Sequence, residues 1–107
     1  MSATDPDALF DDIAVELAAR GAGAGTMFGK RALKVHGKAF ACLQGEVLAF
    51  RLGEGTDGHA TALALTGAEL FDPSGKKRPF KDWVAVPLTH AGRWPDLAET
   101  ALNGLPS

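Results

Sequence analysis

Three short apolar runs separated by glycine turns constrain the fold of this 107-residue chain more than any other feature. The runs cover residues 33–35, 39–43 and 47–52, and the turns are His36-Gly37-Lys38 and Gln44-Gly45-Glu46. Turns this short join antiparallel neighbours, because a parallel crossover needs a dozen or more residues. The segment therefore predicts a three-stranded antiparallel meander.

Helical patterns precede and follow the meander. Residues 5–20 predict a helix in which Asp5 can cap the N-terminus and Pro6 fits the first helical position. The glycine-rich run at 21–25 predicts the loop that ends this helix. Residues 57–66 predict a short helix with Thr56 or Asp57 as its cap, with a strand over 59–65 as the alternative. Apolar spacing predicts a last helix at 94–103.

Two further strands complete the predicted order. Residues 69–71 and 82–88 have strand composition, with the turn signal Asp72-Pro73-Ser74-Gly75 between them. The order is then α-β-β-β-α-β-β-α. It predicts an α+β fold in two layers, a five-stranded antiparallel sheet with helices on one face. The chain is long enough for one domain, 1–107, with a core over about 8–103.

Composition narrows the functional classes. The formal net charge is −2, from 11 Lys+Arg and 13 Asp+Glu, which argues against a protein that grips DNA through its overall charge. A single cysteine excludes an internal disulfide framework. The acidic N-terminal segment is the opposite of a signal peptide's basic start, and no apolar run is long enough to span a membrane. We therefore expect a cytoplasmic protein with no membrane association.

Residues with catalytic or metal-binding chemistry are scattered. His36, His59 and His90 lie far apart, and none has a second ligand at helical metal spacing. Cys42 falls inside an apolar strand, which favours a buried, inert thiol. We expect no catalytic residues, no metal and no cofactor. An enzyme whose site is assembled from His36, Cys42 and Asp82 remains the least favoured alternative.

The alternation of side chains suggests an apolar second face on the sheet. Within 39–43, Phe40 and Cys42 are expected on one face. Trp83 alternates with Val84 and Val86, so it points to the face opposite them, as does Val47 in its own strand. A sheet with one layer of helices rarely leaves such a face in water. We therefore expect Val47 and Trp83 to contact a partner, most simply a second copy of the chain.

Basic residues form two clusters in the sequence, one over residues 30–38 and one over residues 76–81. Their members are Lys30, Arg31, Lys34 and Lys38, then Lys76, Lys77, Arg78 and Lys81. If both clusters met at one end of the sheet, they would form a patch for nucleic acid or for an acidic partner. The alternative is that they are solvated strand edges, where lysine deters aggregation.

Several short motifs together resemble the TfoX N-terminal domain family, the amino-terminal module of the TfoX/Sxy competence regulators. The resemblance begins at Met27-Phe28-Gly29, continues through Phe40-Ala41 and the Leu-x-Phe-Arg-Leu stretch at 48–52, and resumes at Phe71, Gly75-Lys76 and 83–87. It implies a compact α+β domain and supplies no catalytic residues. The second glycine of the family segment is Lys30 here.

The family's full-length regulators carry a second, helical domain, so the resemblance implies a stand-alone version of the first. The resulting expectation is a small non-enzymatic domain that acts through protein–protein contact or regulation, with a homodimer as the first partner expected. The alternative is a nucleic-acid-associated regulator that uses the basic clusters at 30–38 and 76–81.

Overall fold

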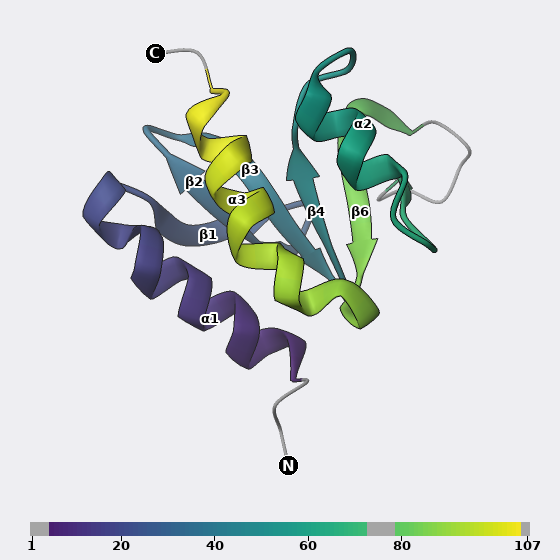
Figure 1. Ribbon diagram of the computed structural model, residues 1–107. Helices are drawn as coiled ribbons and strands as arrows, with labels where there is room; N and C mark the ends of the chain where they lie inside the picture. The colour runs from purple at the N-terminus through teal and green to yellow at the C-terminus, as the bar shows by residue number, and fades with distance from the viewer. Residues whose placement is uncertain (1–4, 73–78, 106–107) are drawn as a thin grey trace.

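Six antiparallel strands form one sheet in the computed structural model, which describes residues 5–72 and 79–105 (Figure 1). The strands lie in the order β1-β2-β3-β4-β6-β5. Short turns join β1 to β4 in sequence, whereas β6 lies between β4 and the edge strand β5. The strand bounds are β1 Gly23–Met27, β2 Lys30–Val35, β3 Lys38–Gln44, β4 Val47–Arg51, β5 Glu69–Phe71 and β6 Phe80–Pro87.

The expectation of five strands is wrong because β1 lies largely within the glycine run that predicted a loop. Glycine has low strand propensity, so the local sequence gives no strand signal here. Pairing with β2 forms this strand instead, in a register that places Gly25 opposite Ala32. The stem of Lys34 lies over Gly25, 3.4 Å from where a Cβ would stand. A side chain at Gly25 would compete for that space.

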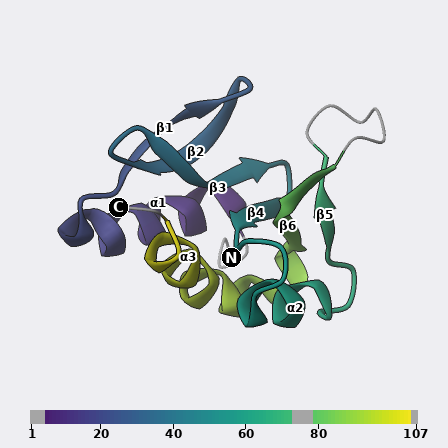
Figure 2. The same ribbon diagram turned by 90° about the horizontal axis from the view of Figure 1, so that it is seen from above.

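Helices cover one face of the sheet, as the sequence predicts (Figures 1 and 2). They are α1 Pro6–Leu17, α2 Asp57–Leu63 and α3 Trp94–Asn103, with 3₁₀ turns at Ala18–Arg20 and Leu88–Arg93. The Asp5 carboxylate accepts the Asp7 N–H at 3.0 Å, and Thr56 Oγ1 accepts the His59 N–H at 3.2 Å. Both side chains therefore cap helix N-termini that the sequence places nearly correctly. The structure thus has the α+β, two-layer architecture.

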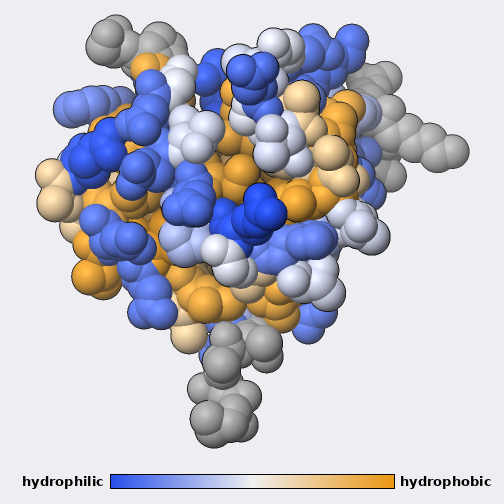
Figure 3. All heavy atoms as spheres, viewed as in Figure 1, coloured by the Kyte–Doolittle hydropathy of each residue, from blue (hydrophilic) through white to orange (hydrophobic). Residues whose placement is uncertain are grey.

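Large side chains fill the space between the helices and the sheet. Trp94 of α3 and Phe10 of α1 are fully buried there, and Trp94 Nε1 donates to the Val86 carbonyl at 3.2 Å. Seen from the helix side, the apolar surface is broken up by hydrophilic residues (Figure 3). The large residues that the strands contribute to this core are Leu33, Val35, Phe40, Leu43, Leu48, Phe50, Val84 and Val86.

A β-bulge in β3 changes which residues share a face. Leu33 pairs with Ala41, but Lys34 pairs with Ala39, so Phe40 is an extra residue in the ladder. Phe40 and Ala41 therefore both point into the helix-side core, and Cys42 points to the opposite face. The expectation that Phe40 and Cys42 share a face is wrong for this reason.

Candidate functional site

The face of the sheet opposite the helices is closed by the chain itself. Its floor is a row of small residues paired across four strands, Ala32, Cys42, Ala49 and Ala85, each at most 7 % exposed. The sheet curls over this floor, so that the β1–β2 hairpin and the β5–β6 side rise on either side of it (Figure 2). We call this surface the concave face.

Four aromatic rings connect the two sides of the concave face. Phe28, in the turn between β1 and β2, lies with its ring centroid 5.6 Å from that of Phe80. Phe80 contacts Phe71 edge-on at 6.3 Å, and Phe71 lies 5.9 Å from Trp83. These separations lie in the range of favourable aromatic pairs. The series therefore joins the two ends of the curled sheet without a further layer of helices.

The two outer rings remain in water while the inner two are buried. Phe28 is 58 % exposed and Phe80 is 36 % exposed, whereas Phe71 and Trp83 are nearly covered. Phe28 and Phe80 together form an exposed aromatic pair, which we call the aromatic rim. Sequence reasoning missed it, because the glycine-rich segment before Phe28 gives no strand signal and therefore does not predict the β1–β2 hairpin.

Phe28 has an unusual backbone conformation. Its φ is +55° and that of Gly29 is +73°, so both turn residues are left-handed. Two-residue hairpin turns of this kind normally have Asn, Asp or Gly at the first position. A bulky residue there costs roughly 1–2 kcal/mol. Backbone strain of this kind tends to cluster at functional sites.

The partner-face residues predicted from the sequence do not lie on an open surface. Trp83 is only 8 % exposed, because Phe71 and the curled sheet cover it. Val47 is half-buried against the same cluster. The expectation of an uncovered apolar face is therefore wrong: alternation correctly assigns the two residues to a face, but it does not report how strongly the sheet curls.

The basic cluster at 30–38 is divided between the two faces of the sheet. Arg31 points to the helix side, where it pairs with Asp7 at 3.3 Å and Asp11 at 2.5 Å and lies 4.4 Å from the centroid of the Phe10 ring. The hydrogen bond that Arg31 donates to Asp11 is the main cause that raises the pKa of Arg31. Lys34 instead lies over Gly25 on the opposite face. The four residues of this cluster therefore do not form one patch.

The remaining basic residues are distributed as follows. Lys38 begins β3 and already interacts within the chain. Lys81 is exposed directly after Phe80 of the aromatic rim. The other members of the second basic cluster, Lys76, Lys77 and Arg78, lie outside the described residues.

The histidines have structural hydrogen bonds in two of three cases. His59 is buried, and its Nε2 lies 2.8 Å from the Lys81 carbonyl. His90 Nε2 lies 2.8 Å from the Thr66 carbonyl. His36, in the β2–β3 turn, has a φ of +51°. Each histidine thus lies in a different part of the fold.

The residues of the alternative enzyme site are not brought together by any hydrogen bond of the described chain. Cys42 is fully buried, and this burial raises the pKa of its thiol, while the charge of Lys30 partly opposes the increase. Asp82 Oδ1 accepts the Glu54 N–H at 2.9 Å, which fixes the loop after β4. Within residues 5–72 and 79–105, no three potential ligands gather to hold a metal ion.

Comparisons with family models, with curated proteins and with solved structures each found no match. The resemblance to the TfoX N-terminal domain family therefore stays a prediction. None of the helices in the described part of the chain is long and apolar enough to cross a membrane.

Proposed function

We propose that this chain is a non-enzymatic protein-binding module of the TfoX N-terminal type, and that the aromatic rim is its contact surface. The observation that carries the proposal is the exposure of two adjacent phenylalanine rings, Phe28 and Phe80, above a buried aromatic pair. Exposed aromatic residues supported by a rigid apolar base are typical centres of protein–protein binding energy.

The position of the rim favours binding through a fixed geometry. Phe28 is held in a two-residue turn, and Phe80 begins a strand of eight residues in the sheet. Little backbone freedom is then lost when a partner binds, which lowers the entropic cost of association. Phe71 contacts Phe80 edge-on and is itself packed against Trp83, so Phe80 rests on a buried aromatic pair.

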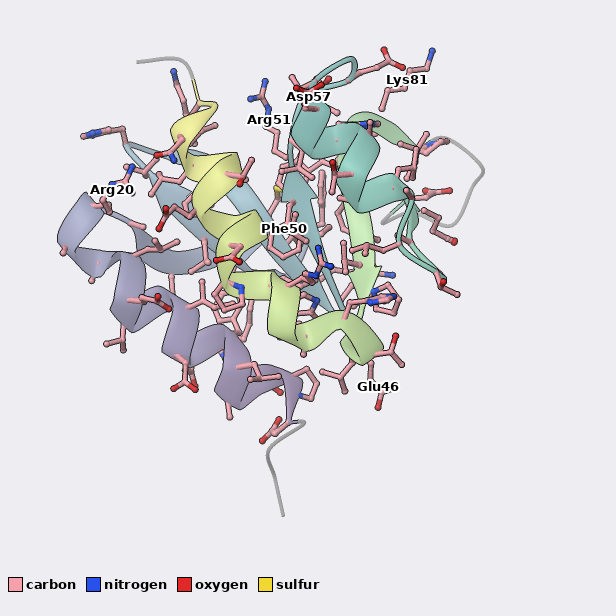
Figure 4. The ribbon with its side chains drawn as sticks, viewed as in Figure 1. Arg20, Glu46, Phe50, Arg51, Asp57 and Lys81 are labelled. Carbon is pink, nitrogen blue, oxygen red and sulfur yellow. The ribbon has the colours of Figure 1, made fainter. Side chains whose placement is uncertain are left out.

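Charge near the rim suggests the chemistry of the partner. Lys81 follows Phe80 and is exposed. Figure 4 shows Lys81 and Arg51 at the same end of the molecule as Asp57, with Glu46 at the other end. Opposite charges across an interface speed association and select partners. The partner surface would therefore present an apolar side chain to the rim and an acidic group to Lys81.

The test compares three variants in quantitative affinity capture from native extract, followed by titration of the purified captured protein. Phe28→Gly removes one ring and leaves a residue that adopts a φ of +55° without strain. Phe80→Ser removes the other ring. Val15→Ser is the control, because Val15 is 77 % exposed on α1, on the helix side.

The proposal expects Phe28→Gly and Phe80→Ser each to weaken binding by roughly tenfold or more, and Val15→Ser to leave it unchanged. Equal affinity for all four proteins would contradict it. Sedimentation in parallel tests the homodimer: a dimer that dissociates on Phe28→Gly identifies the partner as a second copy. Salt-dependent capture of nucleic acid that is insensitive to Phe28→Gly would instead support the nucleic-acid alternative.

A further inference from the structure

A pocket of about 290 Å³ opens beside the floor of the concave face, on the side of the edge strand β5. Strand β5, the loop before it and the β3–β4 turn region form its walls, and Ala85 of β6 contributes to its base. Its volume is near the lower end of the range for small-molecule sites. The lining residues are Gln44, Val47, Gly67, Glu69, Leu70, Phe71, Asp72 and Ala85.

Each polar side chain of this pocket carries at least one hydrogen-bond acceptor: Glu69 and Asp72 are carboxylates, and Gln44 has an amide oxygen beside its N–H donors. Glu69 and Asp72 line it from β5 and its end, and Gln44 lines it from the end of β3. Glu69 is exposed and forms no ion pair with residues 5–72 or 79–105. At neutral pH a carboxylate has two oxygens that only accept, so this side of the pocket favours a ligand that donates hydrogen bonds.

Gln44 contributes a second, independent observation. Its Oε1 is buried and has no hydrogen-bond partner, the one such side-chain atom found in the described residues. A buried polar atom without a partner costs roughly 1–3 kcal/mol and calls for an explanation. The terminal torsion of glutamine is soft, so the amide can rotate toward a donor placed in the pocket.

Apolar groups form the other walls. Val47, Phe71 and Ala85 line the space beside the acceptors, whereas Leu70 pairs with Val84 and points its side chain to the helix side. A short hydrocarbon stem fits such walls, since each buried methylene contributes about 0.8 kcal/mol. The positive charge of Lys30 lowers the pKa of the nearby Cys42 thiol, but Lys30 does not line the pocket.

We propose that this pocket binds a small organic cation, a primary ammonium group on a short alkyl stem. The ammonium group donates to Glu69 and Gln44, and the stem lies between Val47 and Phe71. Neither Phe28 nor Phe80 lines the pocket, so the site is distinct from the aromatic rim, although Phe71 of its wall contacts Phe80. Binding is expected in the millimolar range, because Glu69 is solvated and exposed ion pairs are weak.

The experiment is a titration of the ¹⁵N-labelled full chain with n-butylammonium, followed by amide chemical shifts. The shifts of Glu69, Leu70, Ala85 and the Gln44 side-chain amide are expected to saturate. Glu69→Gln and Gln44→Leu should each weaken binding about threefold to fivefold. Glu46→Gln is the matched control, since Glu46 is an exposed carboxylate in the neighbouring turn that does not line the pocket.

Two neutral or charged analogues and one peptide analogue decide the remaining questions. The proposal would be overturned if 1-butanol bound as tightly as n-butylammonium, or if Glu69→Gln left the affinity for n-butylammonium unchanged. It would also be overturned if n-butylammonium gave no saturable shifts at tens of millimolar. Tighter binding of pentanoate would overturn it as well. If N-acetyl-lysine-N-methylamide binds more tightly than n-butylammonium, the cation is a lysine side chain of a peptide; if it binds less tightly, the cation is a free amine.

Discussion

The two faces of the sheet are buried by different means. On the helix side, large residues such as Phe50 and Leu48 contact a separate layer formed by α1, α2 and α3. On the concave face, small residues such as Ala49 and Ala85 form the floor, and the sheet curls until Phe28 reaches Phe80. The small side chains let the sheet curl until its own strands cover this face, so the face needs no second layer of helices.

The comparison also separates stability from recognition. The helix-side core is closed, and its largest side chains have no exposed surface. The concave face is closed in its centre, but it leaves an aromatic rim at one place and a pocket at another. We therefore expect substitutions on the helix side to affect folding alone, and those on the concave face to affect folding or binding according to position.

The largest effect is expected for Phe50→Ala on the helix side. Phe50 is fully buried beneath α3 (Figure 4), so its loss leaves a cavity between the two layers. The free energy of unfolding should fall by about 3–5 kcal/mol, as measured by urea denaturation. A loss below about 1 kcal/mol would show that the helix layer contributes less than its burial suggests.

Trp83→Ala tests whether the concave face is dry in a single chain. Because Trp83 is 8 % exposed and contacts Phe71, its removal should cost about 3 kcal/mol even at dilutions where any dimer dissociates. The measurement is urea denaturation across a range of protein concentrations. A cost that appears only at high concentration would instead place Trp83 in an interface.

Ala49→Leu tests how tightly the concave face is closed. Ala49 is fully buried in the row of small residues, so a larger side chain must displace its neighbours. Overpacking of this kind should lower the free energy of unfolding by about 1–3 kcal/mol. Thermal denaturation of Ala49→Leu measures it, with Ala60→Leu at an exposed position of α2 as a control expected to be neutral. An equally neutral Ala49→Leu would mean that the face is open.

Cys42 predicts a pH dependence that belongs to the concave face. Burial raises the pKa of the Cys42 thiol, so its contribution to stability is complete below the thiol's ordinary pKa. It is lost as the pH rises toward the pKa of the folded state. Urea denaturation between neutral pH and pH about 10 should show a fall that is smaller in Cys42→Ala. Identical slopes in the two proteins would contradict the assignment.

The smallest effect is expected for the ion pair on the helix side. Asp11→Asn removes the closer partner of Arg31, whose side chain is 41 % exposed, so the cost should be below about 1 kcal/mol and smaller still in high salt. Asp12→Asn is the neighbouring control on α1. Equal stability of the two variants would mean that the pair contributes nothing measurable.

The sequence predicts most elements because they have local causes. Alternation and glycine turns predict β2, β3 and β4, and the caps Asp5 and Thr56 place the starts of α1 and α2 within about a residue or two. Strand β1 has no local cause, since it exists through its pairing with β2. Local pattern therefore predicts elements, and it fails where tertiary pairing outweighs propensity.

The candidate site depends on features that sequence spacing does not contain. The bulge at Phe40 moves Cys42 to the concave face, and a second register shift between Leu70 and Phe71 accompanies the pairing of Phe71 with Phe80. The curl of the sheet determines whether Trp83 is covered. It results from the twist of the strands together with these two register shifts. The aromatic rim and the pocket could be found only in three dimensions.

The strand order has a consequence for how the molecule assembles. Strands β1 to β4 meet through turns of two residues, whereas β6 reaches β4 from far along the chain and pairs Val47 with Pro87. Closing a long loop costs more conformational entropy than closing a hairpin, so it is slower. We therefore expect the meander to form early and the arrival of β6 to limit the folding rate, so that both binding surfaces are completed only in that last step.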